Sequence, residues 1–330
     1  MVAEVIVGID VSAETLDVAV EVAGEQLPVE QFSNDAKGHD LLARWLTKSG
    51  KSVRVVLEST GVYSLDVTLA LYACEAMEVM VANPRALKDF TRATMQRSKS
   101  DAKDAASIRE FAKRMPFVPW QPPAEEALEL REIARRISAL TVERSREKNR
   151  QHAGEASESG SRVVLNDIEV NIRHLERRID LMTKHAVDLV KKHTELQRAF
   201  KRLTSVKGIA ESSAVQILPE LLVLPSDMTV RQWVAHCGLD PREFKSGSSV
   251  EKPTRISRVG NVRLRRALFI PALVASRFEP RVKAFYEKLL ANGKKPLQAL
   301  VAVMRKLLHA IYGMLKTDSD FDGEKFYACG

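Results

Sequence analysis

The stretch that decides the fold covers residues 5–22 and reads VIVGIDVSAETLDVAVEV. Residues 5–9 form a short apolar run, the pattern of a strand that is buried on both faces of a sheet. Residues 16–22 alternate apolar and polar side chains, which predicts a second strand. Asp10 follows the first run directly, so this fold would carry a carboxylate at the tip of a buried strand.

Strand and helix patterns continue to alternate up to about residue 120. The further elements expected here are strands over residues 53–57 and 79–82 and helices around residues 41–45 and 65–73. Asn83-Pro84 ends the last strand, because proline cannot donate a hydrogen bond to a neighbouring strand. Strands interleaved with helices indicate an α/β layer. Gln121-Pro122-Pro123 marks a break, so residues 1–120 are expected to form one domain.

Residues 124–200 have the pattern of two long helices joined by a polar turn. In the first helix, Leu130, Ile133, Ile137 and Leu140 lie at helical spacing, and residues 153–161, rich in Gly, Ser and Glu, predict the turn. The second helix has an apolar stripe in steps of three and four, formed by Leu165, Ile168, Ile172, Leu175, Ile179, Met182, Ala186 and Leu189 and extended by His193, Leu196, Phe200 and Leu203. More than three heptads favour an antiparallel coiled-coil arm. Two helices packed on a globular core are the alternative.

Residues 201–320 are expected to form a helical C-terminal domain. Its first part, residues 203–218, reads LTSVKGIAESSAVQIL. This is similar to a helix-hairpin-helix, in which a Gly-rich turn offers backbone N–H groups to a phosphate. Ala210 stands in place of the usual second glycine, which weakens that interpretation.

Composition excludes several classes of protein. The 330 residues contain three cysteines and no CxxC pair, which excludes a disulfide framework and a cysteine zinc site. No run approaches the roughly 18 apolar residues of a membrane span, and no secretory signal is evident, so we expect a cytoplasmic protein without a membrane partner. The formal net charge is +8. Residues 85–114 hold nine Lys or Arg against four Asp or Glu, and residues 231–275 hold nine against three, which indicates two polyanion contacts.

Four carboxylates are candidates for a metal centre. Asp10 and Glu58 each follow a buried strand, and parallel neighbouring strands would bring their tips together. Asp101 and Asp104 are three residues apart, which places them on one face of a helix that Ser100 could cap. Converging carboxylates repel one another unless a cation lies between them, and Mg²⁺ or Mn²⁺ suits oxygen ligands. Two such ions could stabilise the attacking and leaving oxygens of a phosphodiester.

The second basic block contains a serine loop. Ser246-Gly247-Ser248-Ser249 is a flexible polar loop, and by spacing alone it is an ordinary loop. A serine among arginines can nevertheless attack phosphorus if its proton is removed and the developing charge is stabilised. The candidate nucleic-acid contacts are Lys207, Arg255, Arg258, Asn261, Arg263, Arg265 and Arg266, since arginine grips phosphates bidentately.

Five motifs in this order carry a resemblance to a known family: GIDVSAETLDV, LESTGVY, SKSDAKDA, VKGIAESSA and CGLDPREFKSGSSV followed by ISRVGNVRLRRAL. The chain resembles the DEDD transposases of insertion-sequence family 110, the bridge-RNA-guided recombinases, from about residue 6 to 313. Ser100 stands where a threonine is common, and Arg258 stands where a lysine is common. Both replacements keep the chemical type of the side chain, a hydroxyl at position 100 and a positive charge at position 258.

The resemblance implies a fold, a site and partners. The fold would be a RuvC-like (RNase H) domain, a coiled-coil arm and a C-terminal transposase domain. The resemblance implies that Asp10, Glu58, Asp101 and Asp104 are Mg²⁺ ligands and that Ser246 is the nucleophile. It also implies a structured non-coding guide RNA, donor and target DNA, and a tetramer of two dimers in which different protomers supply the RuvC-like and serine halves of each site. The protein would then be nucleoid-associated in a bacterium.

Three alternatives stand beside transesterification through a phosphoserine. A RuvC-like nuclease acting on branched DNA would need the carboxylates but not Ser246. An actin-like nucleotide-binding fold also carries an Asp on its first strand, but GIDVSAETLDV lacks the Gly-rich phosphate loop of that class. A nucleic-acid-binding scaffold would bind equally well without any of the four carboxylates.

Overall fold

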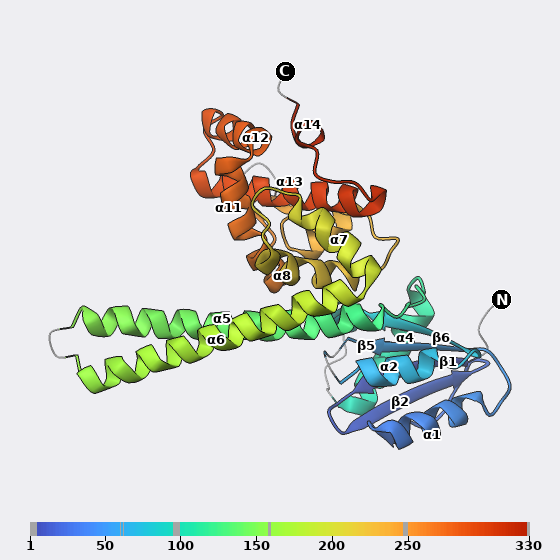
Figure 1. Ribbon diagram of the computed structural model, residues 1–330. Helices are drawn as coiled ribbons and strands as arrows, with labels where there is room; N and C mark the ends of the chain where they lie inside the picture. Colours follow the sequence, from blue (N-terminus) through green and yellow to red (C-terminus); the bar gives the residue numbers. More distant parts are fainter. Residues whose placement is uncertain are drawn as a thin grey trace. The chain divides into compact units, whose positions relative to one another are not determined.

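The computed structural model describes residues 5–59, 61, 63–94, 100–157, 160–246 and 250–328, and it describes no side chains over residues 243–253. The chain divides into two compact units, Met1–Pro122 and Pro123–Gly330. The first contains a mixed sheet with helices, and the second is mostly helical (Figure 1). The α/β plus helical division expected from the sequence is confirmed at this level. No described helix is long and apolar enough to cross a membrane.

A six-stranded sheet forms the core of the first unit, in the order β3-β2-β1-β5-β6, with β4 also paired to β2. The strands are β1 (Val5–Val11), β2 (Thr15–Val22), β3 (Glu25–Gln26), β4 (Glu30–Ser33), β5 (Val53–Glu58) and β6 (Met77–Ala82). β1 is antiparallel to β2 but parallel to β5, which is parallel to β6. The central strand β1 is therefore hydrogen-bonded on both edges, and most of its residues are buried, as its apolar run predicts.

Helices cover both faces of this sheet. One face of β1 presents Val5, Val7 and Ile9 to a core shared with the helices α1 (Ala36–Thr47) and α2 (Leu65–Tyr72). The helices α3 (Pro84–Ala93) and α4 (Asp101–Arg114) contribute to a second core, around Val56 of β5. Side chains alternate along a strand, so Gly8 and Asp10 of β1 lie on the α4 face.

The second unit begins with a helical hairpin. α5 (Glu125–Glu155) and α6 (Arg162–Lys192) each have 31 residues and lie side by side in opposite directions (Figure 1). The apolar stripe expected from the sequence includes the buried Ile172 and Leu175. The register was expected to extend through His193, but there the backbone is extended, and a separate helix, α7 (Thr194–Thr204), follows.

The remainder of the second unit packs around α13. Its helices are α8 (Glu211–Leu222), α9 (Val230–His236), α10 (Val262–Ala267), α11 (Phe269–Phe278), α12 (Pro280–Ala291), α13 (Pro296–Thr317) and α14 (Gly323–Phe326). The expectation of an entirely helical region was wrong in one place, because β7 (Pro241–Ser246) and β8 (Val250–Ile256) form an antiparallel hairpin. The strands are polar and β8 contains Pro253, so no apolar run reveals them.

Candidate active site

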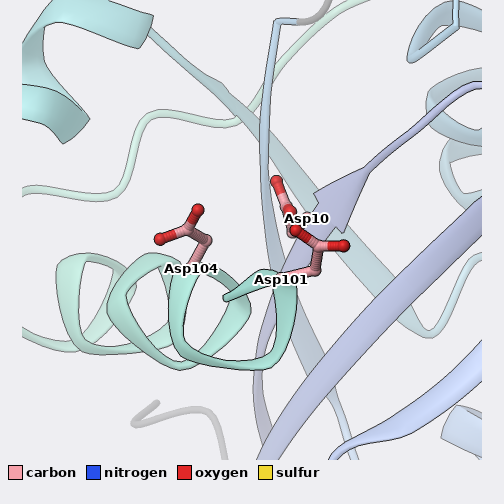
Figure 2. A group of neighbouring side chains, drawn as sticks. All are labelled: Asp10, Asp101 and Asp104. Carbon is pink, nitrogen blue, oxygen red and sulfur yellow. The ribbon is translucent and has the colours of Figure 1, made fainter. Parts of the chain in front are cut away.

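Three carboxylates from distant parts of the first unit form a cluster. Asp10 comes from β1, while Asp101 and Asp104 come from the first turn of α4 (Figure 2). One ligand oxygen from each lies within 4.8 Å of those of the other two. Three hard oxygen donors at this spacing suit a divalent cation such as Mg²⁺ or Mn²⁺, so the donor set fits a metal centre.

Gly8 allows α4 to approach the sheet. A Cβ at this position would lie 2.7 Å from the Arg109 Cα and would overlap the backbone of Ala105 and Arg109 more severely still. The absence of a side chain therefore permits backbone-to-backbone packing of α4 on β1. Asp10 is two residues further along the same face, so this contact sets the separation between Asp10 and the α4 aspartates.

A buried ionic group fixes the other end of α4. Glu21 of β2, with 4% of its side chain exposed, is 2.6 Å from the Lys113 ammonium. The Nε of the equally buried Arg109 is 3.9 Å from Glu21 and has no hydrogen-bond partner among the described residues. Removing one partner of such a buried group leaves an uncompensated charge, so the group holds α4 in position along the sheet.

The environment of Asp10 disfavours its charged form. The pKa of Asp10 is raised from 3.8 to about 6, by burial first and then by the negative charges of Asp104, Asp101, Glu58 and Asp17, in that order of size. The carboxylates therefore repel one another when the site is metal-free. A bound divalent cation would relieve this repulsion.

Glu58 and Asp17 flank Asp10 on the sheet. The parallel pairing of β1 with β5 runs as far as Ile9 opposite Leu57, so Asp10 and Glu58 are the next residues of neighbouring strands. Glu58 is not one of the three clustered ligands, but its charge acts on Asp10. Asp17 is directly opposite Asp10 on β2 and is buried. Sequence reasoning did not single out Asp17, and the signal that could have found it is the register of the β1–β2 hairpin.

Ser100 occupies the N-cap position of α4, as expected. Its hydroxyl makes no capping hydrogen bond, and instead its carbonyl oxygen accepts from the Lys103 and Asp104 N–H groups at 2.9 Å. The aspartates of the first turn lie at the positive end of the helix dipole, which stabilises their charge.

The serine expected as nucleophile lies in the second unit. Ser246 is the last residue of β7, and its side chain lies outside the described residues, as do all atoms of residues 247–249. The interpretation of residues 246–249 as a flexible loop therefore falls on residues that are not described, apart from the β7 backbone.

The expected nucleic-acid contacts divide into exposed and internal side chains. Those that are exposed are Lys207, Arg255, Arg258, Arg263 and Arg266. Arg265 donates instead to the Cys237 carbonyl at 2.7 Å. Asn261 caps α10 by accepting from the Leu264 N–H at 3.0 Å and donates to Glu220 at 2.8 Å. These two side chains therefore hold the basic segment in place within the unit.

Glu220 is the centre of that internal network. Its carboxylate, 3% exposed, accepts two hydrogen bonds from Arg135 of α5, at 2.8 and 3.2 Å, besides the one from Asn261. Burial raises the pKa of Glu220, but the Arg135 and Asn261 hydrogen bonds and the charges of Arg135 and Arg131 outweigh it and hold the pKa below its usual value. The network ties the base of the hairpin to α8 and to the start of α10.

The turn between α7 and α8 packs internally. Gly208 has φ +117°, and a Cβ there would lie 2.8 Å from the Pro271 carbonyl and 2.9 Å from the Ala275 nitrogen of α11. The glycine of the helix-hairpin-helix-like segment is therefore required for close packing on α11, while Lys207 beside it is exposed.

Comparison with known proteins assigns the family. Residues 7–153 match the DEDD-type transposase family of IS110, and residues 200–287 match the transposase family of IS116, IS110 and IS902. The chain is 28% identical to a pilin gene-inverting protein of Moraxella bovis over 327 residues, which is 96% of this chain and 97% of the relative. A second pilin gene-inverting protein, from Moraxella lacunata, is 27% identical over the same shares.

A third relative is an uncharacterized 43.6 kDa protein of insertion element IS110 from Streptomyces coelicolor. It is 28% identical over 120 residues, which is 36% of this chain and 29% of the relative. The two family matches cover most of the chain and include Asp10, Glu58, Asp101, Asp104 and Ser246. This family acts on DNA, and its acidic motif implies dependence on a divalent metal. The chain thus belongs to the IS110 family of DEDD transposases, and its enzyme class is DNA transposase and recombinase.

Proposed function

We propose that this enzyme cuts and rejoins DNA strands by transesterification, with Ser246 as nucleophile and with Mg²⁺ held by Asp10, Asp101 and Asp104 together with Glu58. The observation that carries the proposal is the cluster of three carboxylates within 4.8 Å in a chain of this family. When bound, the metal would supply Lewis-acid stabilisation of the developing negative charge on the phosphate oxygens.

The remaining chemistry belongs to the chain itself. The Ser246 oxygen attacks phosphorus, the P–O bond to the leaving strand breaks, and the oxygen of that strand takes up a proton from solvent to become a hydroxyl. An aspartate of the cluster, supplied by another protomer, takes the serine proton. The phosphoserine link conserves the bond energy, so a strand hydroxyl can reverse the step and reseal DNA without ATP. The exposed Arg255, Arg258 and Arg263 neutralise phosphates on the strand.

A trapping experiment tests the nucleophile. Incubation with labelled DNA and Mg²⁺, followed by denaturation, should leave a covalent adduct on the wild-type enzyme and on Ser248→Ala, the matched control from the same segment. Ser246→Ala should form none, and Asp10→Asn should also form none because the metal centre is lost. An adduct on Ser246→Ala would remove Ser246 from this role.

A metal-dependent nuclease that uses water is the second candidate. One observation favours it, because all three carboxylates that form the cluster among the described residues belong to the first unit. In that case Ser246→Ala would still cut branched DNA, whereas Asp10→Asn would not. Strand cleavage by the two variants therefore separates the candidates.

The fold of the first unit is, in this proposal, a RuvC-like RNase H fold. The sheet order β3-β2-β1-β5-β6, with β2 antiparallel and the next strands parallel, supports this assignment. The acidic residues lie at the carboxyl ends of the central parallel strands, where α/β sheets place their sites.

Sequence choice is assigned to a structured non-coding RNA that pairs with donor and target DNA. The exposed cations of the second unit, among them Lys207 and Arg266, support binding of a polyanion. Sequencing of the nucleic acid that copurifies with the protein tests this, and the absence of a defined RNA would refute it. Because two relatives are pilin gene-inverting proteins, the recombination assay should include a substrate that scores inversion.

The helical hairpin is proposed to act as a coiled-coil arm that joins protomers into dimers and tetramers. Ile172 is buried within the hairpin, so the expected stripe holds the two helices of one chain together. The outer face of α6 instead exposes Val163 (79%), Val170 (59%) and Leu181 (52%), which the helical repeat places in line.

Light scattering tests this assembly. Val170→Glu with Leu181→Glu should reduce the molar mass of the assembly. Leu41→Glu, at a position of α1 that is 58% exposed, is the matched control and should leave the mass unchanged. An unchanged mass in the α6 variant would refute the role of this face.

A further inference from the structure

The solvent-facing side of α4 borders a hollow of about 480 Å³, which we call the α4 groove. It lies between α3, α4 and the edge strand β3. The side chains that give it its character are Lys103, Arg109, Glu110 and Arg114 of α4, with Thr94 beside α3 and Gln26 of β3. Apart from the Glu110 carboxylate, these side chains carry N–H or O–H donors of the kind that bind phosphate oxygens in protein–DNA contacts.

The groove carries an excess of positive charge. Three cations face one carboxylate, that of Glu110. Arg114 and Arg109 both contact Glu110, at 3.0 and 3.5 Å, and Arg109 also pairs with Glu21. Lys103 is exposed and makes no ion pair with any described residue. Once these pairs are counted, the charge of Lys103 is left without a described partner, while Arg114, whose side chain is 65% exposed, keeps a solvent-facing guanidinium beside its surface pair with Glu110.

The groove runs along the helix whose first turn carries two aspartates of the cluster, and none of the three clustered aspartates lines it. Lys103 is next to Asp104 in the chain, on the same helical turn as Asp101, and Arg114 ends the helix. At 1.5 Å per residue the two cations are about 16 Å apart along the axis, close to the length of five nucleotides of B-form DNA at about 3.4 Å each. A negatively charged cluster repels a DNA backbone, so flanking cations are needed to bring a phosphodiester to it.

We propose that the α4 groove binds the sugar-phosphate backbone of the DNA strand that enters the carboxylate cluster, with Lys103 on the phosphate nearest the scissile one and Arg114 on a phosphate further along. This inference rests on the proposed DNA-cleaving function and names a binding surface for its substrate. Lys103 and Arg114 contribute affinity without regard to sequence, because phosphate contacts carry no base information.

Salt-dependent binding tests the proposal. The affinity of Lys103→Ala/Arg114→Ala for a labelled single-stranded DNA is measured by fluorescence anisotropy in EDTA, between about 50 and 200 mM salt. The slope of log K against log salt should fall by about 1.4, because each of the two lost phosphate contacts contributes about 0.7 on a single strand, and affinity at the low-salt end should fall about tenfold. The charge-conserving Lys103→Arg/Arg114→Lys variant should retain the wild-type slope.

The matched control is Lys37→Ala/Arg44→Ala. It removes the same charge from exposed positions of α1, which packs against the core on the opposite face of the sheet. Its slope should equal that of the wild type. Equal slopes for the groove variant and this control would overturn the proposal. The proposal would also be overturned if the groove variant lost affinity only for RNA of the same sequence and not for DNA. It would likewise be overturned if the variant differed from the wild type only in binding inorganic phosphate.

The experiment separates this inference from the proposed function. Binding in EDTA needs no catalysis, so failure of the Ser246 mechanism would leave the slope measurement intact. Conversely, Asp10→Asn should lose strand cleavage while keeping the wild-type slope. Suppose that Asp10→Asn abolishes cleavage while the groove variant keeps the wild-type salt slope. That result would refute the role of the α4 groove and would leave the proposed function intact.

Discussion

Substitution of Gly8 by alanine should disable the metal centre without touching a ligand. The new Cβ would lie 2.7 Å from the Arg109 Cα and closer to two other backbone atoms of α4. Carbon atoms reach optimal contact at about 3.5–4.0 Å, so α4 must move away from β1 by about 1 Å. All three of these atoms are backbone atoms, which cannot avoid the methyl group by a rotamer change.

The magnitude follows from two effects. Overpacking of this kind costs about 1–3 kcal/mol of stability. The displacement also moves the helix that carries Asp101 and Asp104 away from Asp10, and a misplacement of about 1 Å can reduce a rate about 100-fold. We therefore expect metal-dependent DNA strand cleavage by Gly8→Ala to fall about 100-fold while the chain remains folded.

The assay pairs strand cleavage with hydrogen exchange measured on peptides from α4. Amides of α4 should exchange faster in Gly8→Ala, because the helix is held less tightly against the sheet. Gly313→Ala is the control, since no atom lies within 4 Å of a Cβ at this position of α13. It should keep full cleavage and gain up to about 1 kcal/mol of stability through helix propensity. Wild-type cleavage and wild-type exchange in Gly8→Ala would refute the reasoning.

Three further predictions concern charge. Glu220→Ala should lower the free energy of unfolding by about 3 kcal/mol, because Arg135 loses a buried partner. Glu220→Gln should lower it by less. Equal denaturation midpoints for the alanine variant and the wild type would contradict this prediction. The metal-free protein should gain stability as the pH falls through about 6, since the pKa of Asp10 is raised to about 6 in the folded state and lies near 3.8 when unfolded; this gain, measured by thermal unfolding, should be absent from Asp10→Asn. Above that pH, added Mg²⁺ should raise the unfolding temperature of the wild type but not of Asp101→Asn/Asp104→Asn, and an equal rise would argue against the carboxylate site.

Hydrophobic patterns in the sequence predict the strands in the interior of the sheet but not the strands at its edge. The runs over residues 5–9 and 53–57 are apolar, apart from the partly exposed Arg54, because β1 and β5 are paired on both sides and covered on both faces. β4 reads EQFS and is largely exposed, so it has no apolar run from which a strand could be predicted. Edge strands are defined by hydrogen bonds to one neighbour, and these depend on tertiary register rather than on local composition.

The same limit applies to the basic block. Arg263 and Arg265 are equally plausible phosphate contacts by sequence, yet Arg263 is exposed whereas Arg265 donates to the Cys237 carbonyl. Asn261 likewise makes internal hydrogen bonds, since its side chain donates to Glu220 and accepts from the backbone at the start of α10. Which cations of a cluster face solvent is decided by how the segment packs, and periodicity does not extend over so short a helix.

The sequence by itself determined the buried central strands, the two long helices and the helical spacing that places Asp101 and Asp104 on one face, because each follows from local patterns of burial and backbone geometry. Only the tertiary structure decided that these aspartates meet Asp10, that Asp17 lies opposite it, and that Glu58 remains outside the closest group. The physical reason is that these relations depend on strand register and on the close approach of α4 at Gly8, which are long-range packing contacts that no local pattern encodes.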